Sequence, residues 1–187
     1  ILHRHMNTII QNQRKERDEL LARHYLMRKS NTDVKTLLDN PMIKLITGPR
    51  RVGKSTYALL MLQGKSFAYL NFDDNLLLSA WDEELVMRTL DEVYPNYEFL
   101  LLDEVQNLKD WDVWVSKLYR RGKNLVITGS NAKMLSGEMA TVLTGRYLQV
   151  EMLPFSLTET IEWKGANINS ISNAKQAEAV AIADDYL

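Results

Sequence analysis

The sequence predicts an α/β protein built on a parallel sheet whose strands are joined by crossover helices. Short apolar runs alternate with stretches of helical pattern along most of the chain, and a parallel sheet with crossover helices requires that element order. The runs are almost continuously apolar, as in Phe99 to Leu102, and strands of this kind are buried on both faces. A glycine-rich segment separates the first run from the first helical stretch.

The predicted elements divide the chain into three parts. Strands are predicted at residues 42–47, 67–72, 97–102, 124–128 and 147–152. Helices are predicted at residues 7–29, 54–63, 77–92, 111–120, 133–143 and 175–187. Residues 1–5 precede the first methionine and are left out of the predicted fold. We therefore expect an N-terminal tail and helix at 1–35, a core at 36–155, and a helical extension at 156–187 that begins a truncated C-terminal region.

The composition is that of a folded globular protein. Of 187 residues, 45% are hydrophobic and 25% are charged, which excludes a chain that is disordered throughout. The chain has no cysteine, so disulfides, thiolate nucleophiles and cysteine-bound zinc are excluded, and we expect a cytoplasmic protein. No apolar run approaches the roughly 20 residues that cross a bilayer, so no membrane partner is expected.

The segment Gly-Pro-Arg-Arg-Val-Gly-Lys-Ser at residues 48–55 fits the P-loop pattern in full. Its glycines let several main-chain N–H groups converge on phosphate oxygens, and the following helix adds the positive end of its dipole. Lys54 would reach the β- and γ-phosphates, and the Ser55 hydroxyl would hold Mg²⁺. The predicted nucleotide-binding residues are Gly48, Arg51, Val52, Gly53, Lys54, Ser55 and Thr56. Arg50 and Arg51 either add positive potential or form an exposed loop tip.

A second motif is the apolar strand that ends in Asp103 and Glu104. The carboxyl ends of parallel strands open on one edge of the sheet, where open α/β folds bind ligands, so we expect Asp103 near Lys54 and Ser55. Asp103 would then coordinate Mg²⁺, directly or through water, and Glu104 would accept a proton from the attacking water. The alternative for both carboxylates is capping of the next helix.

Two further segments carry candidate catalytic residues. The apolar strand at 124–128 runs out into the segment Thr128-Gly129-Ser130-Asn131, whose hydroxyl and amide groups would orient the water or contact the γ-phosphate. The alternative is that Ser130 or Asn131 caps the next helix. Arg146, just before the last strand, suits the charge that develops on a transferring phosphoryl group and could act in its own or a neighbouring subunit. A salt bridge at the edge of the sheet would explain Arg146 equally well.

Together, GPRRVGKS, FLLLDEVQN followed by Trp111, VITGSNAK, and LTGRY followed by PFSLTE resemble a group of bacterial and archaeal AAA-type P-loop ATPases. The resemblance covers residues 44–162 and implies a five-stranded sheet of order 5-1-4-3-2. It implies that Lys54 and Ser55 are the Walker A pair, that Asp103 and Glu104 are the Walker B pair, and that Ser130 or Asn131 is the sensor. Chains of the family continue into a second half with winged-helix-like and nuclease-like elements, so the resemblance places the effector domain outside this chain.

The leading functional hypothesis is Mg²⁺-dependent ATP hydrolysis coupled to a conformational change in a partner domain or subunit. A P-loop phosphotransferase is the first alternative, although the sequence shows neither an acceptor pocket nor an arginine-rich lid. The second alternative is a nucleotide-binding switch without turnover, which would not need Glu104. ATP and Mg²⁺ are the expected cofactors, and a homo-oligomer is left open.

Nucleic acid is a weaker candidate partner. The net charge is −1, and the basic residues of the N-terminal helix are interspersed with Glu16, Asp18 and Glu19, which favours a solvated helix face. Trp111 and Trp114, three residues apart on a predicted helix, are interpreted as core packing rather than as a base-stacking pair.

Overall fold

The computed structural model describes residues 2–25, 28, 33–130, 134, 143–156 and 159. Its helices are α1 (Leu2–Leu21), α2 (Val34–Asp39), α3 (Lys54–Met61), α4 (Asn75–Ser79), α5 (Glu83–Val93), α6 (Trp111–Arg120) and the short 3₁₀ helix η1 (Val105–Asn107). Its strands are β1 (Ile43–Gly48), β2 (Phe67–Asn71), β3 (Phe99–Asp103), β4 (Asn124–Ser130) and β5 (Tyr147–Glu151).

The five strands form one parallel sheet in the order β2-β3-β4-β1-β5. This order confirms the one implied by the family resemblance. The register pairs Gly48 with Ser130 and Asn71 with Asp103. The carboxyl ends of β1, β3 and β4 therefore lie along one edge of the sheet.

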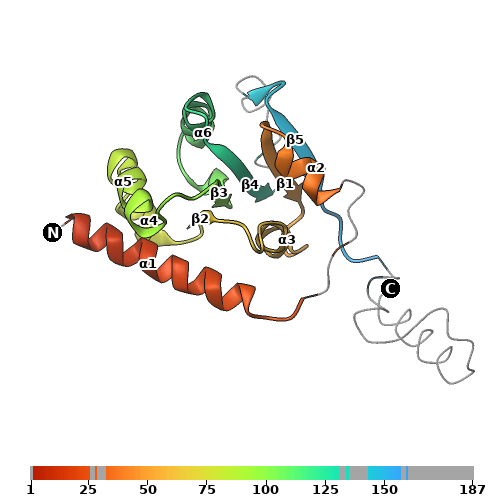
Figure 1. The fold of residues 1–187 in the computed structure, drawn as a ribbon, viewed down its shortest axis with the longest axis horizontal. Coiled ribbons are helices and arrows are strands. Elements are labelled where there is room, and N and C mark those ends of the chain that lie inside the picture. The colour runs from red at the N-terminus through yellow and green to blue at the C-terminus, as the bar shows by residue number, and fades with distance from the viewer. Residues whose placement is uncertain are drawn as a thin grey trace, which may run out of the picture.

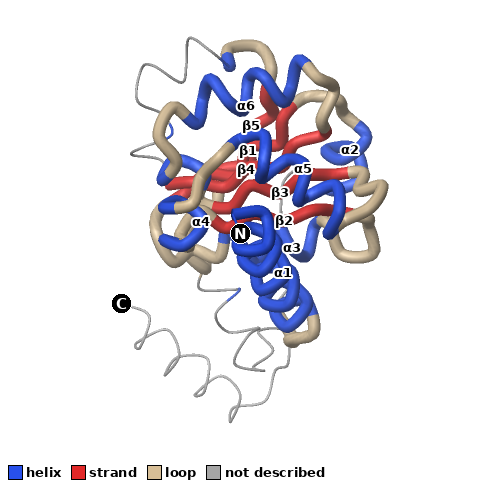
Figure 2. Tube along the Cα trace, turned by 90° about the vertical axis from the view of Figure 1, so that its left-hand side faces the viewer, coloured by secondary structure: helices blue, strands red, loops and turns tan. Residues whose placement is uncertain are grey.

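Helices cover both faces of the sheet (Figure 1) and leave the strands as the central layer (Figure 2). One hydrophobic cluster joins α4, α5 and α6 to strand residues such as Leu45, Leu100 and Ile127. The second joins α2 and α3 to alternate residues of the same strands, such as Ile46 and Val126. Two buried faces explain why the strands are apolar at nearly every position.

Helix α1 runs along the edge strand β2. Met6, Ile9 and Ile10 are buried in the first cluster, whereas Leu20 and Leu21 pack against the second. Three side-chain contacts satisfy main-chain groups of β2. Gln13 Nε2 donates to Asn71 O at 3.1 Å, Asn71 N donates to Gln13 Oε1 at 3.0 Å, and Arg17 Nη1 donates to Phe67 O at 2.6 Å. The helix thereby covers a sheet edge that would otherwise be open to pairing with another strand.

The predicted limits of the N-terminal helix were wrong at both ends. Residues 2–5 were left out of the fold, but they form the first turn of α1, and His3 Nε2 lies 2.9 Å from Glu92 Oε2. The helix ends at Leu21 instead of residue 29. Met6, immediately after those residues, is buried, so this first turn leads directly into the core.

Other differences between the predicted and the observed helices follow from helix caps. The single helix predicted at 77–92 is two helices, because Asp74 accepts a hydrogen bond from Leu76 N and Asp82 accepts one from Leu85 N. Helix α2 was not predicted, although Asp33 caps it through Thr36 N. Of the helix predicted at 133–143 only residues 134 and 143 are described, and the helix predicted at 175–187 lies outside the described residues.

Trp111 and Trp114 pack in the core, as predicted. Both are buried, and the ring of Trp114 lies edge-on to Phe72 and Trp81, with centroids 6.0 and 4.9 Å away. None of the helices in the described part of the chain combines the length and the apolarity needed to cross a membrane.

Candidate functional site

The site lies at the carboxyl edge of the sheet, where the loop between β1 and α3 meets the ends of β3 and β4. The loop provides Lys54 and Ser55, β3 ends in Asp103 and is followed by Glu104, and β4 provides Thr128. The predicted Walker A and Walker B residues are therefore brought together in space.

Glycine is required at two positions of the loop. Gly48 has φ +151°, and a Cβ atom there would lie 2.2 Å from Met152 O, so a side chain would collide with the main chain after β5. Gly53 has φ +88° and precedes the first residue of α3. Only glycine adopts such a conformation without strain. The loop thus turns directly into the N-terminus of α3, where main-chain N–H groups favour an anion.

Lys54 is buried and contacts two oxygens. Its Nζ donates to Pro49 O at 3.0 Å and lies 3.3 Å from Glu104 Oε1. The first contact holds the ammonium against its own loop, and the second pairs it with the carboxylate that follows β3. Lys54 therefore stands between the loop and Glu104.

Asp103 is buried and accepts hydrogen bonds from three hydroxyl groups. Ser55 Oγ donates to Oδ1 at 2.7 Å, Thr128 Oγ1 donates to the same oxygen, and Tyr69 Oη donates to Oδ2 at 3.2 Å. Burial raises the pKa of Asp103 above its usual range, while the hydrogen bonds from Thr128 and Ser55 act in the opposite direction. The three donors fix the carboxylate in one orientation.

Glu104 has an unusual backbone and two polar partners besides Lys54. Its φ is +52°, in the left-handed region that non-glycine residues rarely adopt. Glu104 N donates to Thr128 Oγ1 at 3.0 Å, and Gln106 Nε2 donates to Glu104 Oε2 at 2.5 Å. Gly129 makes room for this glutamine, since a Cβ there would lie 2.4 Å from Gln106 Oε1. Strain of this kind is often concentrated at functional sites.

The residues present fit a magnesium ion held together with phosphate. Ser55 and Asp103 offer a hydroxyl and a carboxylate oxygen in direct contact. No group of three or more His, Asp or Glu side chains within the described ranges could hold a metal. Mg²⁺ is commonly bound by one or two protein oxygens, with water and phosphate oxygens completing the shell, so this small donor set matches it.

A cavity of about 300 Å³ adjoins the loop. Its lining includes Tyr25, Arg28, Gly53, Thr56, Tyr57 and Phe155. Tyr57 Oη is buried and has no hydrogen-bond partner within the described structure. A larger, more open groove of about 790 Å³ is lined by side chains of α5 and α6 and by Arg121, and it contains none of the predicted site residues.

The remaining predicted catalytic residues are Ser130, Asn131 and Arg146, and they do not all lie at this edge of the sheet. Ser130 ends β4 beside Gly48, at the site edge. Asn131 lies outside the described residues. Arg146 directly precedes β5, at the amino ends of the strands, and its Nη1 donates to Ser116 Oγ at 3.2 Å. Arg146 is therefore at the opposite edge of the sheet from the loop of its own chain.

Sequence reasoning did not assign Tyr69 or Gln106 to the site, and it expected the Thr128 hydroxyl to contact water or phosphate rather than Asp103. The contact of Thr128 with Asp103 depends on the pairing of β3 with β4. The contact from Tyr69 depends on which strand neighbours β2, and no local pattern in the sequence marks it. Gln106 depends on the positive φ of Glu104, which the sequence does not reveal.

Comparison with known proteins agrees with the fold. A family model described as an AAA domain matches residues 40–161. An uncharacterized protein of Methanocaldococcus jannaschii is 36% identical over 163 residues, which are 84% of this chain and 37% of that protein. An uncharacterized protein of Haemophilus influenzae is 34% identical over 144 residues, which are 71% of this chain and 36% of that protein. The chain thus spans little more than a third of the curated relatives it matches.

Two solved structures share the fold at low sequence identity. A DNA replication initiation factor superposes with a TM-score of 0.52 at 18% identity, covering 82% of this chain and 51% of that one. A replication initiator DnaA bound to AMPPCP and single-stranded DNA superposes with a TM-score of 0.50 at 16% identity, covering 78% and 52%. With the family match over most of its length, this chain belongs to the AAA-domain family of P-loop ATPases.

Proposed function

We propose that this chain binds ATP and hydrolyses it with Mg²⁺ to ADP and phosphate. The observation that carries the proposal is the meeting of two residue pairs at one sheet edge, Ser55 with Asp103 at 2.7 Å and Lys54 with Glu104 at 3.3 Å. Each pair joins the glycine-rich loop to the carboxyl end of β3. Membership in the AAA-domain family supports nucleotide binding and hydrolysis in general.

Nucleotide binding would use the loop for the phosphates and the adjoining cavity for the base. Main-chain N–H groups between Gly48 and Thr56 would surround the β- and γ-phosphates, with Arg51 and Val52 in the loop. Lys54 would exchange Pro49 O and Glu104 for phosphate oxygens. The cavity has aromatic walls from Tyr25, Tyr57 and Phe155 that suit a flat purine, and it lies beside Gly53 and Thr56.

Ser55 and Asp103 would hold the magnesium ion, Ser55 through its hydroxyl and Asp103 directly or through water. Mg²⁺ would supply positive charge against the oxygens of the transferring phosphoryl group. The hydrogen bonds from Tyr69 and Thr128 would keep the Asp103 carboxylate oriented when Ser55 turns from Asp103 towards the ion.

Glu104 would act as the general base for hydrolysis. It would take a proton from water as the water oxygen attacks the γ-phosphorus, and the bond to the β–γ bridging oxygen would break to release ADP. Ser130 and Asn131 are proposed to contact the water or the γ-phosphate. Because Arg146 lies at the far edge of its own sheet, its proposed role in stabilising the γ-phosphate requires a neighbouring copy of the chain.

The test is the rate of ADP and phosphate release by wild type, Lys54→Ala and Glu104→Gln, with Glu84→Gln as an exposed control. We expect Lys54→Ala to lose nucleotide binding, and Glu104→Gln to bind but to turn over about 100-fold or more slowly, which is the usual range of a general-base contribution. Equal turnover in all four proteins would contradict the proposal. Transfer of the γ-phosphate to a small acceptor instead of water would indicate a kinase, and binding without any phosphate release would indicate a switch.

We further propose that ATP hydrolysis is coupled to a conformational change in a partner domain. The curated relatives are much longer than this chain, and we propose that the remaining part of the protein carries the element that responds to the nucleotide. A nucleotide-dependent change in the proteolysis pattern of that remaining part would support the coupling, and an identical pattern with and without ATP would contradict it.

A further inference from the structure

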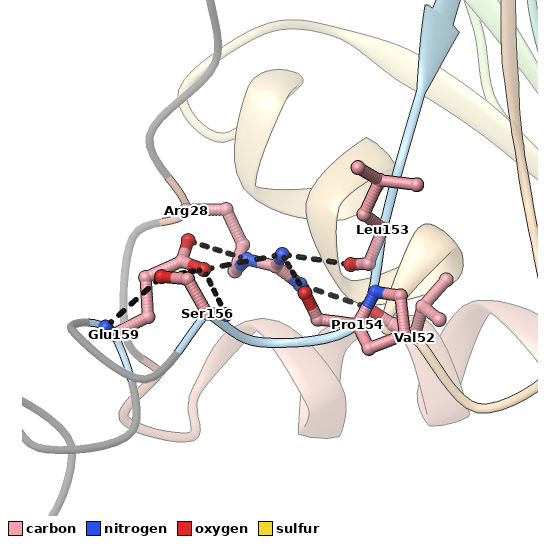
Figure 3. Close-up of polar contacts among 6 residues, drawn as sticks. All are labelled: Arg28, Val52, Leu153, Pro154, Ser156 and Glu159. Atoms are coloured by element: carbon pink, nitrogen blue, oxygen red, sulfur yellow. Dashed lines mark hydrogen bonds and ion pairs between the residues drawn. The ribbon is translucent and has the colours of Figure 1, made fainter.

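Arg28 joins three separate parts of the chain (Figure 3). Its Nη1 donates to Val52 O in the phosphate-binding loop at 3.1 Å. Its Nη2 donates to Leu153 O at 2.9 Å and to Pro154 O at 3.4 Å, in the segment after β5. Its Nε donates to Glu159 Oε1 at 2.8 Å, and its guanidinium carbon lies 4.3 Å from the centre of the Phe155 ring.

These contacts form a clasp, by which we mean Arg28, Val52, Leu153, Pro154, Phe155 and Glu159. Its ion pair is largely buried, whereas Leu153 and Phe155 are exposed. The side chains of Arg28 and Glu159 are only 13% and 11% exposed, although 131 residues separate them. Removing one partner of a mostly buried, hydrogen-bonded ion pair is strongly destabilising, because the other charge stays buried without a partner. The Arg28–Glu159 pair is therefore unlike a surface ion pair, which contributes little to stability.

The contact with Val52 bears directly on phosphate binding. The peptide between Val52 and Gly53 is planar and trans, so its C=O and N–H point in opposite directions. A donor that fixes the Val52 carbonyl also fixes the direction of the Gly53 N–H, one of the main-chain donors of the loop. Arg28 therefore sets the orientation of a phosphate-binding group without lying in the loop.

The contact with Glu159 reaches the start of the C-terminal extension. Ser156 N and Ser156 Oγ donate to Glu159 Oε2 at 2.9 and 3.0 Å, and Glu159 N donates to Ser156 Oγ at 3.2 Å. This reciprocal pattern is a capping box, which marks the N-terminus of a helix. The guanidinium thus links the loop to Ser156 and Glu159, at the start of the extension predicted at 156–187.

We infer that Arg28 is a positioning residue for the phosphate-binding loop and couples nucleotide in that loop to the segment from Leu153 to Glu159. The inference rests on the proposed nucleotide binding. One rigid guanidinium donates both to Val52 O and to the acceptors after β5. A movement of the loop that shifts Val52 O therefore changes the hydrogen bonds from Arg28 to those acceptors. Coupling of this kind is reciprocal. Glu159, which does not contact the loop, should therefore contribute to nucleotide affinity.

The test uses the full chain with a non-hydrolysable ATP analogue and Mg²⁺, comparing wild type with Arg28→Lys, Glu159→Gln and the control Arg14→Lys. Arg14 is a matched arginine, since it donates to Val93 O at 2.7 Å and lies over the Tyr94 ring, away from the loop. Calorimetry gives the affinity, and amide hydrogen exchange at Leu153, Phe155 and Ser156 gives the response of the segment.

We expect Arg28→Lys to weaken binding by about 10-fold, since lysine keeps the charge but loses the fork of donors. Glutamine serves in a capping box, so Glu159→Gln removes the ion pair specifically, and we expect it to weaken binding about threefold. Saturating analogue should slow exchange at the three amides in wild type and in Arg14→Lys, but not in Arg28→Lys.

Wild-type affinity and wild-type protection in both Arg28→Lys and Glu159→Gln would overturn the inference and leave the proposed nucleotide binding intact. Failure of wild type to bind the analogue would overturn both. If Arg28→Lys does not fold, Glu159→Gln decides alone: an affinity equal to that of wild type overturns the inference, and a reduced affinity at unchanged melting temperature supports it.

Discussion

The ammonium of Lys54 lies 3.3 Å from Oε1 of Glu104, so the cation of the phosphate-binding loop is paired with the carboxylate proposed as the general base. In the proposed function, a nucleotide phosphate would compete with Glu104 for Lys54. When Lys54 turned to phosphate, Glu104 would lose its cationic partner and become available to a water molecule. The pair would therefore link phosphate binding to the release of the base.

Glu104→Gln should bind nucleotide more tightly than wild type. The substitution removes the carboxylate that competes for Lys54, and a pair of this kind is worth roughly 1 kcal/mol, or about a fivefold change in affinity. Titration with a non-hydrolysable ATP analogue measures the effect. Glu83→Gln, which breaks the partly exposed pair with Lys117, should leave the affinity unchanged. A Glu104→Gln protein that binds more weakly than wild type would contradict the competition.

Thr128→Val should impair catalysis while keeping the shape of the core. Thr128 Oγ1 accepts from Glu104 N and donates to Asp103, so valine leaves a buried N–H without its acceptor and a carboxylate without one of its donors. We expect a loss of about 1 to 3 kcal/mol in the free energy of unfolding, together with a lower kcat. The matched control is Thr89→Val, since Thr89 is buried and donates only to Leu85 O in α5. Equal kcat in the two variants would count against the role of Thr128.

Gly48→Ala should abolish nucleotide binding and destabilise the fold. The new Cβ would lie 2.2 Å from Met152 O, and either the loop or the end of β5 must move, at a cost of roughly 2 to 4 kcal/mol. Gly122→Ala is the control, because Gly122 also has a positive φ but has no atom within 4 Å of the added carbon. Thermal unfolding and nucleotide titration of both variants check the prediction. A Gly48→Ala protein that binds as wild type does would show that the tight loop geometry is unnecessary.

Lys44 should make the stability of the protein depend on pH above neutrality. Its side chain is fully buried, its Nζ donates to Asn40 O and Asn124 Oδ1 at 2.5 Å each, and burial lowers its pKa to about 8. Between pH 8 and about 10.4, the usual pKa of lysine, the unfolded chain binds more protons than the folded one. The free energy of unfolding should therefore rise with pH in that window, by roughly 1 to 3 kcal/mol.

Denaturant unfolding at several pH values between 7 and 10.5 measures this rise, and Lys44→Met is the comparison. Methionine has similar length and no charge. The free energy of unfolding of wild type should therefore rise relative to that of Lys44→Met as the pH increases. A difference that stays constant over the whole range would show that Lys44 does not titrate in this window.

The sheet and the main part of the site could be predicted because they depend on local patterns and on one rule of parallel sheets. Apolar runs locate strands that are buried on both faces, and parallel strands share their carboxyl edge. Lys54, Ser55, Asp103 and Glu104 converge at this edge because only β4 lies between β1 and β3. The caps at Asp74 and Asp82 divide the helix predicted at 77–92 into two, and the apolar pattern alone does not show this division.

Contacts that depend on tertiary placement were not predictable from the sequence. Tyr69 resembles any core aromatic in a strand, and its contact with Asp103 arises because β2 neighbours β3 with Asn71 opposite Asp103. Arg28 resembles the other basic residues of its region, and its role in the clasp depends on segments more than a hundred residues away. Arg146 matched a chemical expectation, but the register of β5 places it at the other edge of the sheet.

The central claim is that the loop from Gly48 to Ser55 and the carboxyl end of β3 form one site for a triphosphate with magnesium. Calorimetric titration of wild type and Lys54→Ala with a non-hydrolysable ATP analogue, each with and without Mg²⁺, tests it most directly. The account predicts binding by wild type that Mg²⁺ strengthens, and loss of that binding in Lys54→Ala. Failure of wild type to bind, or equal affinity in both proteins, would contradict the account.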